Sequence, residues 1–115
     1  MMTRKLKSIA LAGFFLAGLQ IQAQDKITYE DHVLPILRNA CLKCHNPDKM
    51  RADLDLSTYN ALMKGGGGGE VVAGGDADGS FLYQVITHAE EPTMPPNGKL
   101  SDKEIEVFKK WIVGG

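Results

Sequence analysis

The spacing of apolar residues after residue 27 predicts a first helix. Thr28 is a helix-capping residue type, and an acid, Asp31, follows it three positions later, as is common where a helix begins. Apolar residues then recur at intervals of three and four, which places them on one helix face: Val33, Ile36, Leu37 and Ala40. Pro35 interrupts this run, so we expect a kink there or a helix that restarts at Pro35. We interpret His32 as a solvated residue of this helix.

Two shorter helices are predicted in the middle of the chain. Ser57 and Thr58 can cap a helix over residues 59–64, and Gly65 ends it. A third helix is expected over residues 81–87, with Asp78 or Ser80 as its cap. The residues that pack this helix are apolar or aromatic: Leu82, Tyr83, Val85 and Ile86. Residues 53–56 alternate between polar and apolar and predict a short extended segment, whereas residues 90–99 form a loop rich in proline.

The last helix has a clear start signal. Ser101 and Glu104 form an S-x-x-E capping box, and the helix is expected to end at Gly114. Its apolar residues form one stripe with two more beside it: Ile105, Phe108 and Ile112, then Val107 and Trp111. Strand content should be near zero. The predicted fold class is therefore all-α, in one small domain with no internal repeat.

Residues 1–23 have the pattern of a secretory signal peptide. Three basic residues, Arg4, Lys5 and Lys7, precede an apolar stretch over residues 9–19, and Ala23 ends a plausible cleavage site. This stretch is too short to span a bilayer comfortably, although an uncleaved membrane anchor is the alternative interpretation. We therefore expect a bacterial protein exported to the periplasm, with a mature domain over residues 24–115, a core over about 27–115, and no stable insertion in the membrane after cleavage.

Charge and size narrow the class of partner. Of the 13 basic residues, three lie in the predicted signal peptide, so the remaining chain carries ten basic and 14 acidic side chains and a formal charge of −4. This mildly acidic balance argues against binding to nucleic acid or to anionic membranes. A domain of about 90 residues has a marginal core and often needs a covalent or bound group to stabilise it.

The stretch Cys41-Leu42-Lys43-Cys44-His45 carries the strongest chemical signal. Two cysteines two residues apart, followed at once by histidine, match the attachment site of a c-type haem. The two thiols would form thioether bonds to one edge of the porphyrin, and His45 would give its imidazole to the iron as the proximal ligand. The chain has no other cysteine, so this motif uses both thiols.

Other interpretations of the two cysteines remain open. A redox dithiol is typically found in a βαβ context, which the pattern does not predict here. A structural zinc ion takes four ligands, whereas the two cysteines and His45 supply three, and neither His32 nor His88 stands at a zinc-finger spacing. Haem attachment is the interpretation that the motif favours, against zinc, a dithiol or a chance match.

Met94 is the best candidate for the second axial ligand of the iron. A thioether is a soft, neutral ligand that favours ferrous iron and raises the reduction potential. Met94 lies in the sequence Thr93-Met94-Pro95-Pro96, and prolines stiffen a loop that must hold such a weak bond. An ordinary packing methionine is the alternative. His88 is the rival ligand and would give iron with two histidine ligands and a lower potential.

Five consecutive glycines, residues 65–69, are open to three interpretations. A flexible surface loop is the simplest of them. Alternatively, backbone N–H groups could approach the haem propionates closely, which glycine permits. A phosphate-binding loop is improbable, because no Gly-Lys-Ser/Thr sequence follows.

The order of these motifs resembles the class I cytochrome c fold and, more narrowly, the planctomycete-type cytochrome c domain of exported bacterial proteins. The similar segments are residues 33–37, 41–45 and 54–57, the glycine run, residues 75–80, residues 94–101 and residues 111–115. The resemblance implies a small helical domain wrapped around one covalent haem c, attached at Cys41 and Cys44 and ligated by His45 and Met94. It also implies contact between the first and last helices, through Leu37 and either Phe108 or Trp111.

Three functions fit this sequence. We favour a mono-haem carrier of single electrons that docks transiently with a redox protein partner and is not itself an enzyme. The second is a haem sensor or enzyme whose sixth site is open or ligated by His88. The third is a structural haem domain of a larger exported protein, in which redox activity is incidental.

Overall fold

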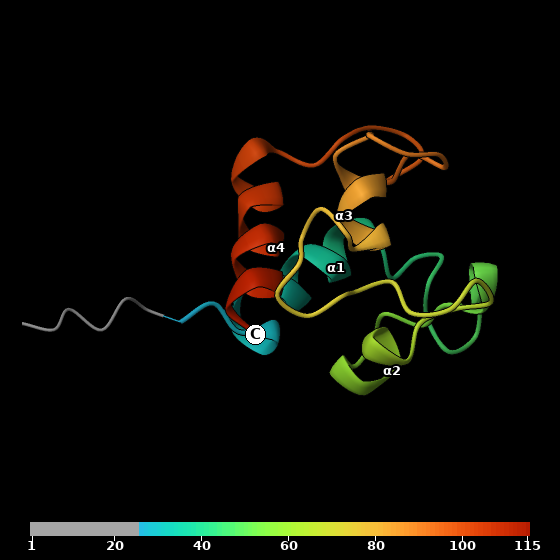
Figure 1. Cartoon of the computed structure of the whole chain (residues 1–115). Helices are drawn as coiled ribbons and strands as arrows, with labels where there is room; N and C mark the ends of the chain where they lie inside the picture. The colour runs from blue at the N-terminus through green and yellow to red at the C-terminus, as the bar shows by residue number, and fades with distance from the viewer. Residues whose placement is uncertain (1–25) are drawn as a thin grey trace, which may run out of the picture.

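Short helices joined by long irregular segments make up residues 26–115, the part of the chain that the computed structural model describes (Figure 1). The predicted signal peptide, residues 1–23, lies outside the described residues. In chain order the elements are η2 (Tyr29–Val33), α1 (Leu34–Ala40), η3 (Arg51–Asp53), α2 (Tyr59–Lys64), α3 (Phe81–Ile86) and α4 (Asp102–Gly114). Over these residues the only β-type pairings are two isolated bridges, Gly66 to Gly69 and Ala73 to Asp76. The helical fold class is therefore as predicted.

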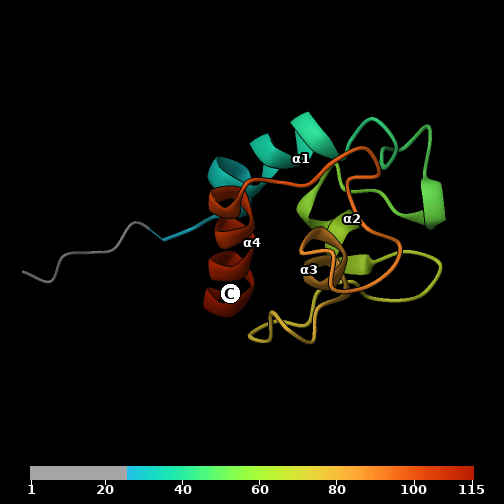
Figure 2. The ribbon, with the colours of Figure 1, turned by 90° about the horizontal axis from the view of Figure 1, so that it is seen from above.

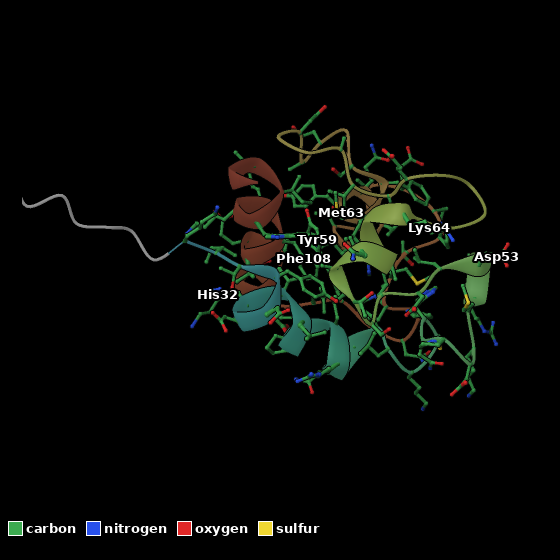
Figure 3. The ribbon with its side chains drawn as sticks, turned by 90° about the horizontal axis from the view of Figure 1, so that it is seen from below. His32, Asp53, Tyr59, Met63, Lys64 and Phe108 are labelled. Carbon is green, nitrogen blue, oxygen red and sulfur yellow. The ribbon has the colours of Figure 1, made fainter. Side chains whose placement is uncertain are left out.

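The first predicted helix is present in two pieces. The Thr28 hydroxyl accepts a hydrogen bond from the amide of Asp31, and a π-helical turn, η2, follows. The regular helix α1 then begins one residue before Pro35, which is the restart that the proline predicted. His32 is half-buried and is not simply solvated, because its Nδ1 accepts a hydrogen bond from the Thr28 amide at 2.9 Å. Figure 3 shows His32 on the outer side of η2.

The two middle helices occupy nearly the predicted residues. The Thr58 hydroxyl caps α2 by accepting from the Ala61 amide, and Gly65 ends α2 with a φ of 83°. This left-handed conformation favours glycine, because a Cβ would strain it. At α3 Ser80 stands at the predicted cap position, but its side chain makes no capping hydrogen bond. Its hydroxyl is fully buried and bonds to the preceding loop instead.

The C-terminal helix α4 packs on the N-terminal helical segment, as Figures 1 and 2 show. The capping box of Ser101 and Glu104 is present with both of its hydrogen bonds. The contact with the N-terminal segment runs through η2, where the rings of Tyr29 and Trp111 lie 6.0 Å apart. The implied contact between the first and last helices is therefore made, and the Tyr29 ring contributes to it beside Leu37 and Phe108, which are both fully buried in the same core cluster.

One cluster of buried side chains forms the core. Phe108 is fully buried and points inward from α4 in Figure 3. Residues from η2 and from all four α-helices join it, and those with almost no exposure are Val33, Leu37, Leu56, Leu62, Ile86 and Ile112. Because short helices bury little surface by themselves, the fold depends on this shared core rather than on any single element.

No helix within residues 26–115 is long and apolar enough to cross a membrane.

Candidate functional site

The end of α1 places both cysteines and the histidine beside one another. The Leu37 carbonyl accepts hydrogen bonds from the amides of Cys41 and Leu42, at 2.8 and 2.9 Å. The Cys41 carbonyl then accepts from the amides of Cys44 and His45, at 3.2 and 3.1 Å. The backbone thus continues to turn after the helix ends, and this local geometry brings the three side chains of the motif to one place.

Asn46 turns the chain back after this motif. Its side-chain amide donates to the Leu42 carbonyl at 2.6 Å, and its side-chain oxygen accepts from the amides of Asp48 and Lys49, both at 2.9 Å. This is the turn that Asn-Pro-Asp predicted, and the asparagine side chain supplies its hydrogen bonds. Further along, the Leu56 amide donates to the His45 carbonyl at 2.9 Å, so the returning chain fixes the backbone of the histidine.

The His45 ring has one nitrogen occupied and one free. Its Nδ1 lies 3.0 Å from the Arg51 carbonyl oxygen. Because a carbonyl oxygen can only accept a hydrogen bond, Nδ1 carries the proton in the neutral ring, and Nε2 keeps an unprotonated lone pair. Metal-binding histidines usually donate their other ring N–H in this way, to a carboxylate, a backbone carbonyl or water.

A cavity of about 850 Å³ opens beside this histidine. Its volume lies in the range of ordinary cofactor pockets. Cys41, Cys44 and His45 line it, and so does Met94 with three prolines of its loop. The other walls are largely apolar and come from the Leu54–Leu56 segment, Val71 and α3, with the residues Leu54, Leu56, Val71, Phe81, Leu82, Val85 and Ile86. The glycine run and η3 also reach the lining, through Gly66, Gly68, Gly69, Arg51 and Ala52. The structure therefore brings four of the five candidate site residues to a single apolar cavity.

Met94 is held in place by its backbone. Its amide donates to the Val85 carbonyl of α3 at 3.0 Å, and Pro92, Pro95 and Pro96 line the cavity on either side of it. His88 is the fifth candidate and is not among the residues that line this cavity. It has a left-handed φ of 64°, and its Nε2 is buried without a hydrogen-bond partner.

Burial affects the chemistry of the first cysteine. Desolvation raises the pKa of the Cys41 thiol to about 11, and the negative charge of Glu104 adds to this effect. Cys41 is therefore a neutral thiol near pH 7, whereas a dithiol that exchanges disulfides needs a thiolate. Within residues 26–115, no three His, Cys, Asp or Glu side chains are grouped so that they could hold a metal ion, so the zinc interpretation gains no support there.

The glycine run is ordered by its own hydrogen bonds. The amides of Gly66 and Gly69 each donate to the carbonyl of the other residue at 3.0 Å, and the Gly67 amide donates to the Ala52 carbonyl at 2.8 Å. The Gly65 amide bonds to the end of α2. These bonds leave the Gly68 amide as the one donor of the run for the propionate contact that the sequence suggested. The flexible-loop interpretation does not fit so many backbone bonds.

Sequence reasoning missed several residues that shape the site. The Arg51 carbonyl orients His45, and the Tyr29 hydroxyl donates to the Leu56 carbonyl at 2.9 Å and so fixes the returning chain. Phe81 lines the cavity although its side chain is 43% exposed, so it lies at the cavity mouth. A backbone carbonyl has no residue-type signature, whereas the aromatic character of Tyr29 and Phe81 was visible in the sequence.

The residues at this cavity suit a c-type haem. Two thiols at the attachment spacing, one imidazole with a free nitrogen and one thioether face a pocket whose walls are mostly apolar. Arg51 also lines it and offers a positive charge to a carboxylate.

Comparison with known proteins gave one family. A family model described as Planctomycete cytochrome C matches residues 41–98, just over half of the chain. The match begins at Cys41 and includes Met94. No curated protein and no solved structure matches the chain.

Proposed function

This chain belongs to the Planctomycete cytochrome C family, and we propose from this membership that it is an exported carrier of single electrons with one covalent haem c. The observation that carries the proposal is the shared cavity. Cys41, Cys44, His45 and Met94 come from two distant parts of the chain and line the same apolar pocket of about 850 Å³. The iron of the haem, when bound, would alternate between its ferrous and ferric states.

The chain's own residues would attach, orient and insulate this group. Cys41 and Cys44 would hold it covalently, and His45 would present Nε2 to the iron because the Arg51 carbonyl accepts its Nδ1 proton. Met94 would supply a second ligand to the iron from a loop anchored on α3. Iron held by both His45 and Met94 would have no open position for a substrate, which suits transfer of electrons rather than catalysis.

The partner is proposed to be a redox protein in the same exported compartment. Phe81 lies at the mouth of the cavity and is partly exposed, so this face is where a haem edge would come near the surface. Electron transfer needs only a brief encounter over a small interface. Export is proposed from the signal-peptide pattern of residues 1–23.

The direct test is a combined mass and absorption measurement. The protein is produced in a bacterial host that matures c-type haem, with a Cys41→Ser/Cys44→Ser variant as the matched control. We expect the wild-type protein to gain the mass of one porphyrin that survives denaturation and to show the spectrum of six-coordinate iron. The variant should keep the bare polypeptide mass. A colourless wild-type protein of bare polypeptide mass would overturn the proposal.

A second experiment tests Met94 against an open sixth site. Met94→Ala should lower the reduction potential and let the ferrous protein bind carbon monoxide rapidly, because a neutral thioether that favours ferrous iron is lost. Met50→Ala is the control, since Met50 is 44% exposed and does not line the cavity. An unchanged potential in Met94→Ala would exclude Met94 as the ligand. Rapid carbon monoxide binding by the wild-type protein would favour the sensor or enzyme alternative.

A further inference from the structure

The glycine run lies against the short helix η3, and η3 holds the ring of His45. We propose that Gly66 and Gly67 are positioning residues: they hold η3 in the conformation in which the Arg51 carbonyl orients His45. This inference rests on the proposed function only in that it assigns His45 to the iron. Its contacts lie entirely within this chain, so the tests below separate the two.

The first step is the contact between His45 and η3. Arg51 is bonded to the haem-attachment motif twice, since its amide donates to the Cys44 carbonyl at 3.2 Å and its carbonyl accepts the Nδ1 proton of His45 at 3.0 Å. Any movement of Arg51 therefore changes the orientation of the ring and the strength of the hydrogen bond at Nδ1. A stronger bond at this nitrogen makes the other nitrogen a better electron donor to a metal.

The second step is that η3 does not hold this conformation by itself. Ala52 and Asp53 both have left-handed backbone angles, with φ of 57° and 56°. Such angles are unfavourable for residues that carry a Cβ, and two in succession persist only where neighbouring structure supports them. None of the three η3 residues is buried, so the hydrophobic core does not supply this support.

The third step is that the glycine run supplies it. The Gly67 amide donates to the carbonyl of Ala52, the middle residue of η3, at 2.8 Å. Gly66 packs so closely that a Cβ at this position would lie 2.6 Å from the Ala52 carbonyl oxygen and 3.2 Å from the Leu54 Cβ. Figure 3 shows Asp53 of η3 and Lys64, the last residue of α2 before the run, toward the same end of the molecule. Only glycine lets the two backbones approach in this way.

The test compares Gly66→Ala with Gly74→Ala in the haem-loaded protein. An added methyl at Gly66 must displace the Ala52 carbonyl, whereas Gly74 is exposed, belongs to another loop and would carry a Cβ with no other atom within 4 Å. We expect Gly66→Ala to keep covalent haem but to raise the reduction potential, because a weaker bond at Nδ1 makes His45 a poorer donor to ferric iron. Gly74→Ala should keep the wild-type potential.

A spectroscopic readout separates positioning from a general loss of stability. In the ferrous protein, the Nδ1 proton of His45 should exchange with solvent at least several-fold faster in Gly66→Ala than in wild type and in Gly74→Ala, as measured by nuclear magnetic resonance. If potential and proton exchange are the same in all three proteins, the inference is wrong while the haem proposal stands. Absence of covalent haem from the wild-type protein would instead refute the proposed function.

Gly67→Ala is the second test variant, to be used if Gly66→Ala does not fold. Its Cβ would meet the Asp53 carboxylate at 2.9 Å, the end of a side chain that can turn away, so the protein should fold with a smaller displacement of η3. We expect the same directions of change in potential and in Nδ1 proton exchange, but smaller ones. Wild-type values for both quantities in a folded Gly67→Ala protein would overturn the inference.

Discussion

At the scale of single residues, one buried hydroxyl organises the loop before α3. Ser80 has no exposed surface, and its oxygen accepts a hydrogen bond from the Ala73 amide at 2.8 Å while its proton points to the Asp76 carbonyl at 2.7 Å. The sequence suggested a helix cap at this position, because serine before an apolar helix is the usual signal for one. The hydroxyl instead bonds to the backbone of the preceding loop, which begins seven residues earlier at Ala73.

Replacing Ser80 tests this role. Ser80→Ala should lower the free energy of unfolding by about 1 kcal/mol, because the Ala73 amide and the Asp76 carbonyl both lose their hydrogen bonds to the buried Ser80 hydroxyl. Denaturant unfolding of the haem-loaded protein measures the change. Ser57→Ala is the control, since the hydrogen bond of Ser57 is made by its backbone amide, and it should be nearly neutral. Equal stabilities for the two variants would contradict this role for the Ser80 hydroxyl.

Tyr29 should make the free energy of unfolding depend on pH in the alkaline range. Desolvation raises the pKa of its phenol, and the negative charge of Asp55 adds to the shift. The folded protein therefore holds the phenol proton more tightly than the unfolded chain, whose tyrosines titrate near pH ~10. The resulting stabilisation is complete below the unfolded pKa and is lost as the pH rises through the higher folded pKa.

Tyr29→Phe should remove this pH dependence. At neutral pH the variant loses the hydrogen bond to the Leu56 carbonyl, which should cost about 1 kcal/mol. The difference in unfolding free energy between wild type and variant should then shrink as the pH rises above about 10. Tyr59→Phe keeps Tyr29 and should keep the wild-type decline. A difference that stays constant through this range would show that Tyr29 does not contribute.

At the scale of elements, the terminal helices are specified by their first turns. The Ser101 hydroxyl accepts from the Glu104 amide at 3.1 Å, and the Glu104 side chain accepts from the Ser101 amide at 3.0 Å. At the N-terminal segment, the reciprocal bond to the Thr28 amide comes from His32 rather than from Asp31. The capping pattern therefore predicted correctly where the two terminal helical segments begin. It predicted the side chain that returns a hydrogen bond to the cap residue correctly only at α4.

The capping box of α4 can be tested by itself. Ser101→Ala should lower the free energy of unfolding by about 1 kcal/mol, because the Glu104 amide loses the hydroxyl that accepts its hydrogen bond. Thermal or denaturant unfolding measures the change. Ser101→Thr keeps a hydroxyl and should recover most of the loss. If the alanine and threonine variants are equally stable, the capping bond contributes nothing to the fold.

At the scale of the whole molecule, the cavity takes up space that buried side chains fill in a protein without a cofactor. Its apolar walls include α3, the Leu54–Leu56 segment and Val71, and residues of all three also belong to the buried core cluster. A domain of this size has little surplus stability, since native proteins are stable by only about 5–15 kcal/mol. The group proposed to fill the cavity would therefore be part of the core.

The protein without haem should accordingly fold poorly. Material made in a host that does not mature c-type haem should show reduced helical signal in far-ultraviolet circular dichroism and a broad thermal transition, because the cavity walls face water. The haem-loaded protein from a maturing host is the control and should unfold cooperatively. A native-like helical signal with a sharp transition in the haem-free protein would contradict this expectation.

Local patterns in the sequence were enough to predict the helices and to recognise the attachment motif. Helix α2 was placed at its observed bounds, α3 and α4 almost so, and Cys41, Cys44 and His45 were recognised from spacing alone. These features depend on interactions among residues a few positions apart. Residue types and their spacing are enough to predict such interactions. The axial ligands and the covalent haem remain predictions, supported by the shared cavity and the family.

Which distant groups meet depends on the packing of the whole chain. This packing brought Met94 to the cavity that His45 lines and left His88 outside that lining; it assigned the Nδ1 proton of His45 to the Arg51 carbonyl, and it packed the glycine run on η3. Backbone carbonyls and amides make most of these contacts. Every residue type but proline carries the same backbone donor and acceptor. The pattern of side chains therefore does not indicate which backbone groups will pair.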